Sequence, residues 1–138
     1  MLNLKKWLII IGIVFSQTAC TAELGEVDAQ GLEKLMASGV TVIDVRTPGE
    51  WKQTGIVKGS IPIMFFDEKR NAHAQEWMQQ ASKHIKPGDQ VAIICRSGRR
   101  SAAVGEFLIK EHGFQHVYNV QGGILGWVAK GNKTVAAN

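Results

Sequence analysis

The chain has 138 residues, and its hydrophobic content of 45% is enough to fill the core of one domain. Its formal net charge of +4 at pH 7 is too small to favour nucleic acid as a partner. The four histidines, His73, His84, His112 and His116, lack the spacing of metal ligands, and no dinucleotide-binding glycine pattern, Walker loop or zinc motif occurs. We therefore expect no metal and no cofactor, and we assign the histidines to the surface or to helix ends.

The N-terminal segment has the three-part pattern of a secretory signal. Lys5 and Lys6 precede a continuous apolar run over Trp7–Phe15, and a small polar segment follows. The run is too short to span a bilayer. We expect residues 1–22 to be removed and residues 23–138 to form the domain, in the periplasm or outside the cell. Removal of the two lysines leaves fourteen basic residues against twelve acidic ones, a net charge near +2.

The number of cysteines in the mature chain depends on where this leader ends. Cleavage after Ala22 leaves Cys95 as the only cysteine, which excludes a disulfide within the chain and favours a chemical role for a thiol in an oxidising compartment. The alternative is cleavage just before Cys20 and attachment of a lipid there, as in a bacterial lipoprotein. Gln17 stands where such signals usually carry leucine, and this weighs against the alternative.

Beyond the leader, short apolar runs alternate with helical patterns, which predicts an α/β fold. Strands are expected at 23–27, 40–45, 60–63, 90–94 and 117–120, and helices at 28–38, 47–55, 71–84, 101–112 and after the turn at 121–123. This order predicts a single domain with a mostly parallel five-stranded sheet and helices on both faces.

Local signals fix some of these boundaries. Asp28 can cap the first helix, and Thr47, Pro48 and Glu50 have the spacing of a capping box with proline at the first helical position. The apolar cluster Met64-Phe65-Phe66 is left open, because it fits the mouth of a pocket and the closure of the core equally well.

Cys95 and the loop after it carry the main functional signal. Cys95 ends a predicted buried strand, and the helix that follows would direct its N-terminus at the sulfur. Free amides, the helix dipole and the positive charge of Arg96, Arg99 and Arg100 all stabilise a thiolate. Gly98 provides the backbone freedom that a loop needs to wrap its amides around an anion. The segment predicts a cysteine nucleophile that attacks an anionic substrate.

Two further residues are expected to support this site. Parallel sheets bind ligands beyond the carboxyl ends of their strands, which is where Cys95 is predicted to lie. Asp44 and Arg46 lie at the end of another predicted strand. We expect a buried ion pair there that holds this edge in register, which is a structural rather than a catalytic role.

Three stretches together resemble the rhodanese family. Asp44–Trp51 with Gly55–Pro62 is similar to the family's D-V-R-x-x-x-E-aromatic and G-H-I-x-G-A segment, Cys95–Arg100 to its C-x-x-G-x-R active-site loop, and Asn119–Trp127 to its closing V-x-G-G-x-x-x-W. The resemblance covers about residues 24–130. The family's histidine after the first glycine is Ile56 here and its alanine is Ser60, which affects packing at the strand entry. One such domain behind a signal peptide is similar to the small periplasmic thiosulfate sulfurtransferases of bacteria.

The resemblance implies a sulfur transfer in two steps. The thiolate of Cys95 would attack the outer sulfur of thiosulfate, sulfite would leave, and the persulfide would pass its sulfur to cyanide or to a thiol acceptor. The implied substrate-binding residues are those of the following loop: Arg96, Ser97, Gly98, Arg99, Arg100 and Ser101. We expect Arg100 to structure the loop, the two other arginines to bind the sulfonate, and the chain to act as a monomer.

Two other functions stay open from the residues alone. Phosphatases and arsenate reductases that share this fold also use a cysteine loop, but theirs has one more residue between cysteine and arginine. Four residues separate Cys95 from Arg100 here, which favours sulfur over phosphorus chemistry. The second alternative is a persulfide carrier that hands sulfur to a partner protein without turnover on small acceptors, and such a carrier would keep the cysteine too.

Overall fold

The computed structural model describes residues 12–14, 16 and 20–138, so most of the expected leader lies outside the described residues. The described chain forms one α/β domain whose five strands are all parallel, in the order β1-β5-β4-β2-β3. The elements are β1 Gly25–Val27, α1 Ala29–Ala37, β2 Thr41–Asp44, α2 Pro48–Thr54, β3 Ile61–Pro62, α3 Ala74–Ala81, β4 Gln90–Ile94, α4 Arg99–His112, β5 His116–Val120 and α5 Gly123–Ala129. The predicted fold class is confirmed. Among these helices, none has the length and apolar character needed to cross a membrane.

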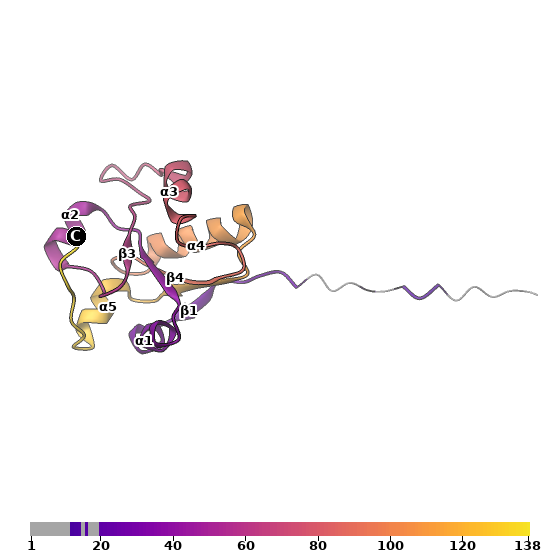
Figure 1. Cartoon of the computed structure of the whole chain (residues 1–138), viewed down its shortest axis with the longest axis horizontal. Helices are drawn as coiled ribbons and strands as arrows, with labels where there is room; N and C mark the ends of the chain where they lie inside the picture. Colours follow the sequence, from indigo (N-terminus) through magenta and orange to yellow (C-terminus); the bar gives the residue numbers. More distant parts are fainter. Residues whose placement is uncertain (1–11, 15, 17–19) are drawn as a thin grey trace, which may run out of the picture.

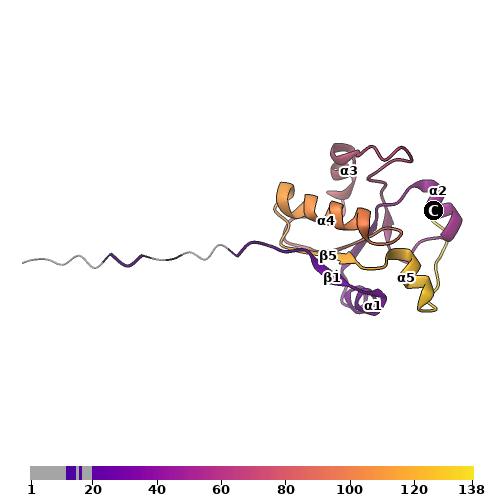
Figure 2. The ribbon, with the colours of Figure 1, turned by 180° about the vertical axis from the view of Figure 1, so that it is seen from behind.

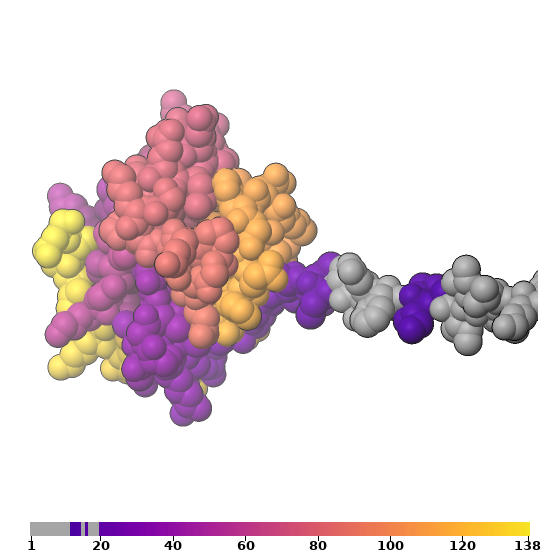
Figure 3. All heavy atoms as spheres, turned by 45° about the vertical axis from the view of Figure 1, so that its right-hand side comes forward, coloured from indigo at the N-terminus to yellow at the C-terminus, as the bar shows by residue number. Residues whose placement is uncertain are grey.

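The helices cover both faces of the sheet. Figures 1 and 2 show α3 and α4 on one side of the strands and α1 and α5 on the other, and the segment containing α3 lies beside α4 at the surface in Figure 3. Successive strand residues point to opposite faces, so Ile43 and Ile93 pack under α3 and α4, whereas Val42 and Ala92 pack against α1 and α5. Burial on both faces explains why the strands read as continuous apolar runs.

The helix-capping signals in the sequence are confirmed. The Asp28 carboxylate accepts a first-turn amide of α1 at 2.8 Å, and Thr47 and Glu50 form the reciprocal bonds of a capping box at the start of α2. The strand ends are less well predicted. β3 is shorter than the expected 60–63, although the Ile63 N–H, directly after Pro62, still donates to the Asp44 carbonyl oxygen at 2.9 Å.

α3 is shorter than the helix predicted over 71–84, which is a correction to the sequence pattern. The Asp67 carboxylate accepts the backbone N–H groups of Lys69 and Asn71, at 2.9 and 2.8 Å, and this holds a tight turn before the helix. The apolar spacing that predicted the longer helix is nevertheless correct over α3, because Trp77 and Ala81 are both buried.

The Met64-Phe65-Phe66 cluster divides between the core and a pocket. Phe65 is 4% exposed and packs edge-on against Trp77. Phe66 is partly buried and lines the pocket described below. Trp77 Nε1 donates to the Ile63 carbonyl oxygen at 3.0 Å, which ties α3 to the segment that carries the cluster. Both readings of the cluster are therefore correct, each for a different residue.

Candidate active site

Cys95 directly follows β4, at the edge of the sheet where the parallel strands β2 and β5 also end. Its side chain is 1% exposed. The Sγ atom accepts a hydrogen bond from the Gly98 N–H at 3.1 Å, and the Ser101 hydroxyl oxygen lies 3.2 Å from it. A backbone N–H directed at sulfur stabilises a thiolate, because its positive end faces the anion.

Gly98 shapes the loop above this sulfur. Its φ of 102° lies in the left-handed region, as the sequence predicts for a loop that wraps its amides around an anion. Gly98 is also the N-cap of α4, which begins at Arg99 rather than at the predicted residue 101. Arg99 and Arg100 therefore belong to the first helical turn, whose N–H groups have no partner within the helix.

The start of α5 holds the loop in place. The amides of Ile124 and Leu125 donate to the carbonyl oxygens of Cys95 and Arg96, at 2.9 and 3.2 Å. Gly123 permits this approach, because its φ is 57° and a Cβ there would lie only 2.5 Å from the Cys95 carbonyl oxygen. The sequence suggests only a turn at Gly122-Gly123, but the pair at the start of α5 also allows the close contact between this helix and the Cys95 loop.

Arg100 is held by Glu50 in a two-pronged ion pair. Its Nη2 donates to Glu50 Oε1 at 2.6 Å and its Nη1 donates to Oε2 at 2.8 Å. The hydrogen bonds from Arg100 are the main reason why the pKa of Glu50 falls from 4.5 to about 2, and the bonds to Glu50 raise the pKa of Arg100. Because Glu50 belongs to α2, the pair joins α2 to α4. This arrangement fits the expectation that Arg100 structures the loop.

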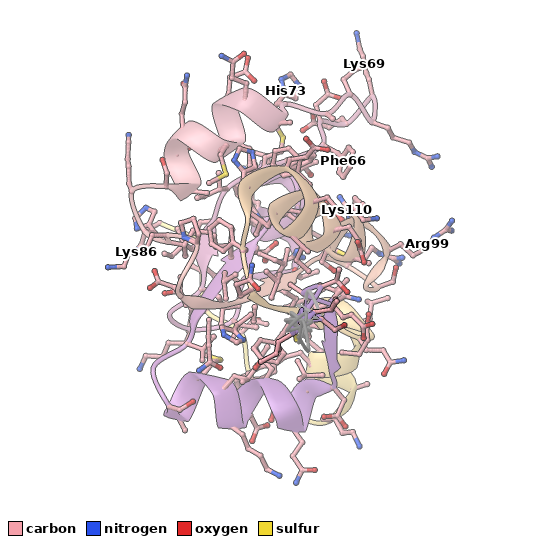
Figure 4. The ribbon with its side chains drawn as sticks, turned by 90° about the vertical axis from the view of Figure 1, so that its right-hand side faces the viewer. Phe66, Lys69, His73, Lys86, Arg99 and Lys110 are labelled. Atoms are coloured by element: carbon pink, nitrogen blue, oxygen red, sulfur yellow. The ribbon has the colours of Figure 1, made fainter. Side chains whose placement is uncertain are left out.

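A pocket of about 710 Å³ opens beside the loop, and its lining includes Phe66, Asp67, Arg70, Arg96, Arg99 and Arg100. Arg96 and Arg99 are exposed. Within residues 20–138, no ion pair engages either of these two guanidiniums. Figure 4 shows Arg99 extending outward from the ribbon. The pocket therefore presents positive charge that is available to an anion.

Asp67 fixes the part of the pocket wall that precedes α3. Its Oδ2 lies 3.0 Å from His73 Nε2. This hydrogen bond is the main cause that lowers the pKa of Asp67 from 3.8 to about 2, and it raises the pKa of His73. Arg70 reaches the pocket from the same turn, with a φ of 66°.

The predicted Asp44–Arg46 pair is present and fully buried. Arg46 Nη2 donates to Asp44 Oδ2 at 2.8 Å, and Arg46 Nε donates to Oδ1 at 3.0 Å. Trp51 Nε1 adds a hydrogen bond to Asp44 Oδ1 at 3.1 Å, while Arg46 also donates to the hydroxyl of Thr54 and the carbonyl of Gly55. The pair therefore fastens the middle and the C-terminal end of α2 to the end of β2, and every polar group in it has a partner.

Asn119 lies directly behind the sulfur-binding groups. It is 4% exposed and is the residue before the end of β5. Its Nδ2 donates to the Gly98 carbonyl oxygen at 3.1 Å and to Glu26 Oε2 at 3.0 Å, and its Oδ1 lies 2.6 Å from the Ser101 hydroxyl. Asn119 is not among the residues assigned to the site from the sequence, because its partners Ser101 and Glu26 lie far from it in the chain.

The predicted loop residues form two groups in the structure, one that lines the pocket and one that contacts the cysteine sulfur beneath it. Arg96, Ser97, Arg99 and Arg100 line the pocket. Gly98 and Ser101 are buried beneath it, against the sulfur. The structure adds three residues to this set: Glu50, Asn119 and Gly123. The sequence offered a sign of Glu50, because it stands at the glutamate of the family's D-V-R-x-x-x-E segment. The sequence did not show that its partner is Arg100.

The predicted positions of the histidines hold in the structure. His73 precedes α3, His84 follows it and is exposed, His112 ends α4, and His116 begins β5. Among the residues described, no group of three or more His, Cys, Asp or Glu side chains is placed to hold a metal ion.

The two departures from the family pattern are accommodated locally. Ile56 is 6% exposed and forms an antiparallel bridge with Val135 near the C-terminus. The Ser60 hydroxyl donates to the Val57 carbonyl oxygen at 2.7 Å, so this buried polar group is satisfied. Neither residue lines the pocket.

These features define a class of protein: a parallel α/β domain that holds a cysteine under an arginine-rich loop at the carboxyl edge of its sheet. Comparison with known families makes the assignment specific. The rhodanese-like domain matches residues 28–130, and the chain belongs to the rhodanese family.

Individual relatives agree with this assignment. The chain is 31% identical over 116 residues to thiosulfate sulfurtransferase 18 of Arabidopsis thaliana, covering 82% of this chain and 85% of the relative. It is 32% identical over 102 residues to thiosulfate sulfurtransferase GlpE of Pseudoalteromonas translucida, covering 73% and 85% of the two chains. A rhodanese-related protein from Thermoplasma volcanium superposes with a TM-score of 0.62 at 29% identity, over 82% of this chain and 99% of that one.

Proposed function

We propose that this protein is a sulfurtransferase that moves sulfane sulfur from thiosulfate to cyanide or to a thiol acceptor through a persulfide on Cys95. The observation that carries the proposal is the position of the Cys95 sulfur, which accepts the Gly98 amide at 3.1 Å beneath a pocket lined by Arg96 and Arg99. Two relatives that are named thiosulfate sulfurtransferases support the choice of donor.

The first step forms the persulfide. The thiolate of Cys95 attacks the outer sulfur of thiosulfate, a new S–S bond forms, and the S–S bond of thiosulfate breaks, so that sulfite leaves with the bonding electron pair. Arg96 and Arg99, which line the pocket, bind the sulfonate oxygens of thiosulfate. The Gly98 amide stabilises negative charge on the cysteine sulfur before the attack.

The second step regenerates the cysteine. The carbon of cyanide, or the sulfur of a thiolate acceptor, attacks the outer sulfur of the persulfide, and Cys95 leaves as a thiolate. The products are thiocyanate or the acceptor's persulfide. The Gly98 amide then stabilises the leaving thiolate as it stabilised the attacking one, so the same group serves both steps.

The test is the intact mass of the purified protein before and after thiosulfate, and again after cyanide. We expect a gain of one sulfur atom that cyanide removes as thiocyanate, and no gain in the Cys95→Ser variant, which should keep the fold. Loss of the added sulfur without repeated turnover would favour the persulfide carrier. No gain of sulfur on a thiol shown to be free would contradict the proposal.

The proposal includes export of the mature domain, residues 23–138, as a monomer in the periplasm or outside the cell. The leader pattern of residues 1–22 supports export, and Cys20 is exposed and free of a disulfide. The mass of the protein recovered from the periplasmic fraction identifies the cleavage site and any lipid on Cys20. Recovery of the uncleaved chain from the cytoplasm alone would contradict export.

A further inference from the structure

The hydrogen bonds of Asn119 have only one consistent direction. A carboxylate and a backbone carbonyl accept hydrogen bonds and cannot donate them. The amide nitrogen of Asn119 must therefore face Glu26 and the Gly98 carbonyl, at 3.0 and 3.1 Å. Its oxygen must then face Ser101, whose hydroxyl oxygen is 2.6 Å away. Glu26, on the edge strand β1, thus determines the orientation of a buried amide.

This orientation decides where the Ser101 proton goes. The Ser101 oxygen lies 2.6 Å from Asn119 Oδ1 and 3.2 Å from Cys95 Sγ, but a hydroxyl has one proton to donate. The amide oxygen takes it, because an amide oxygen is a stronger acceptor than a cysteine sulfur and 2.6 Å is short even for an O–H···O bond. Ser101 then presents a lone pair to the sulfur, which suits a neutral thiol as donor and does not suit a thiolate.

The same side chain also holds the second group that touches the sulfur. The Gly98 N–H donates to Cys95 Sγ, and the Gly98 carbonyl accepts from Asn119. Asn119 therefore contacts the residues on both sides of the sulfur, although it contacts neither the sulfur nor the pocket. Its position in β5 is rigid, because β5 pairs with both β1 and β4.

We propose that Asn119, oriented by Glu26, is a positioning residue that withholds the Ser101 hydroxyl proton from the Cys95 sulfur and so sets the balance between thiol and thiolate. The proposal rests on the proposed role of Cys95 as the nucleophile. While the Ser101 hydroxyl donates to Asn119, it offers the sulfur only a lone pair, and turning its proton toward the sulfur leaves Asn119 Oδ1 without this donor.

The test is a double-mutant cycle on the pH dependence of Cys95 alkylation by iodoacetamide. Asn119→Leu removes the acceptor of the Ser101 proton, so we expect the midpoint pH of alkylation to fall by about 0.5 to 1 unit. In a Ser101→Ala background there is no hydroxyl proton to release, so the same substitution acts on the sulfur only through Gly98 and should shift the midpoint clearly less. The other charges near the sulfur, Arg100 with Glu50 and Asp44 with Arg46, are identical in both backgrounds.

A surface substitution provides the second arm, which does not disturb the core. Glu26→Gln replaces the charged acceptor of the Asn119 amide nitrogen by a neutral one, while the Gly98 carbonyl still fixes which way the amide faces. Asn119 is then held less firmly against Ser101, and we expect a smaller shift in the same direction. Glu23→Gln, an exposed substitution on the segment before β1, is the matched control and should leave the midpoint unchanged.

Two results would overturn the proposal: equal shifts with and without the Ser101 hydroxyl, which is what a purely structural role gives, or no shift in both Asn119→Leu and Glu26→Gln. If Asn119→Leu fails to fold, Glu26→Gln and its control decide alone. Alkylation requires no sulfur donor. A positive cycle in a protein that gains no sulfur from thiosulfate would therefore contradict the proposed function and leave the role of Asn119 standing.

Discussion

The three arginines of the loop differ in their surroundings, although they are neighbours in the sequence. Both terminal nitrogens of the Arg100 guanidinium donate to the carboxylate of Glu50. Arg96 and Arg99 are exposed and line the pocket. A guanidinium already paired with a carboxylate offers little charge to a substrate, whereas the other two retain theirs. The loop therefore separates a structural arginine from two that are placed to bind the donor.

This difference predicts the effect of Arg99→Ala on kinetics with thiosulfate. Loss of one exposed, charge-assisted contact with the sulfonate should raise KM about 3- to 10-fold and change kcat little. Steady-state kinetics at constant ionic strength measure this. Lys110→Ala is a matched control, because Lys110 is a basic residue of the same helix, α4 (Figure 4). It pairs with Glu106, and neither residue lines the pocket. An unchanged KM in Arg99→Ala would contradict the role assigned to it.

At the scale of elements, α5 acts as a brace for the loop. Its first amides bind the carbonyl oxygens of Cys95 and Arg96, and the close approach requires that residue 123 have no side chain. A helix that begins against the backbone of another loop leaves no room for a Cβ at the point of contact. The closing G-G stretch is thus a packing requirement of the candidate site.

Gly123→Ala should therefore be strongly destabilising. The new Cβ would collide with the carbonyl groups of Cys95 and Arg96, in a backbone conformation with φ of 57° that alanine disfavours. We expect a loss of about 2–4 kcal/mol in the free energy of unfolding, measured by urea denaturation. Gly126→Ala in the same helix is the control, because a Cβ there meets only the Gln121 carbonyl oxygen at 3.7 Å. It should be neutral or stabilise by up to about 1 kcal/mol. Similar losses in both variants would contradict this account.

The elements that the sequence predicts well are those with local signals. The capping residues Asp28 and Thr47, the end of α4 at His112 and the buried runs of β2 and β4 each depend on neighbours in the chain. The predicted parallel sheet follows from the order of these elements. The position of the thiol beneath the loop could also be predicted from neighbouring residues, because Cys95 and Gly98 are only three residues apart in the sequence.

The contacts that escaped prediction join distant segments. Glu50 meets Arg100 across 50 residues, and Asn119 meets Glu26 across 93. Such pairs depend on which strands are neighbours and in what register, and the sequence does not state either. The turn before α3 escaped prediction for another reason: the Asp67 carboxylate accepts the N–H groups of Lys69 and Asn71, and only Asn71 belonged to the predicted helix.

At the scale of the whole molecule, the Glu50–Arg100 pair makes stability depend on acid. The folded-state pKa of Glu50 is about 2, below its ordinary value of 4.5, with the hydrogen bonds from Arg100 as the main cause. A carboxyl group with a lowered folded-state pKa contributes stability that is fully present above its unfolded pKa. That contribution is lost as the pH falls from about 4.5 toward 2.

Glu50→Gln should remove this part of the acid sensitivity. Because the pair is partly exposed, we expect about 1 kcal/mol of the wild-type loss between pH 5 and pH 2.5 to be absent in the variant. Urea midpoints at the two pH values, with unchanged slopes, measure it. Glu106→Gln, which removes the carboxylate of the exposed Lys110 pair, is the control and should lose stability as the wild type does. If Glu50→Gln lost as much stability as the wild type over this range, the pair would contribute nothing to folding, and α2 and α4 would be held by packing alone.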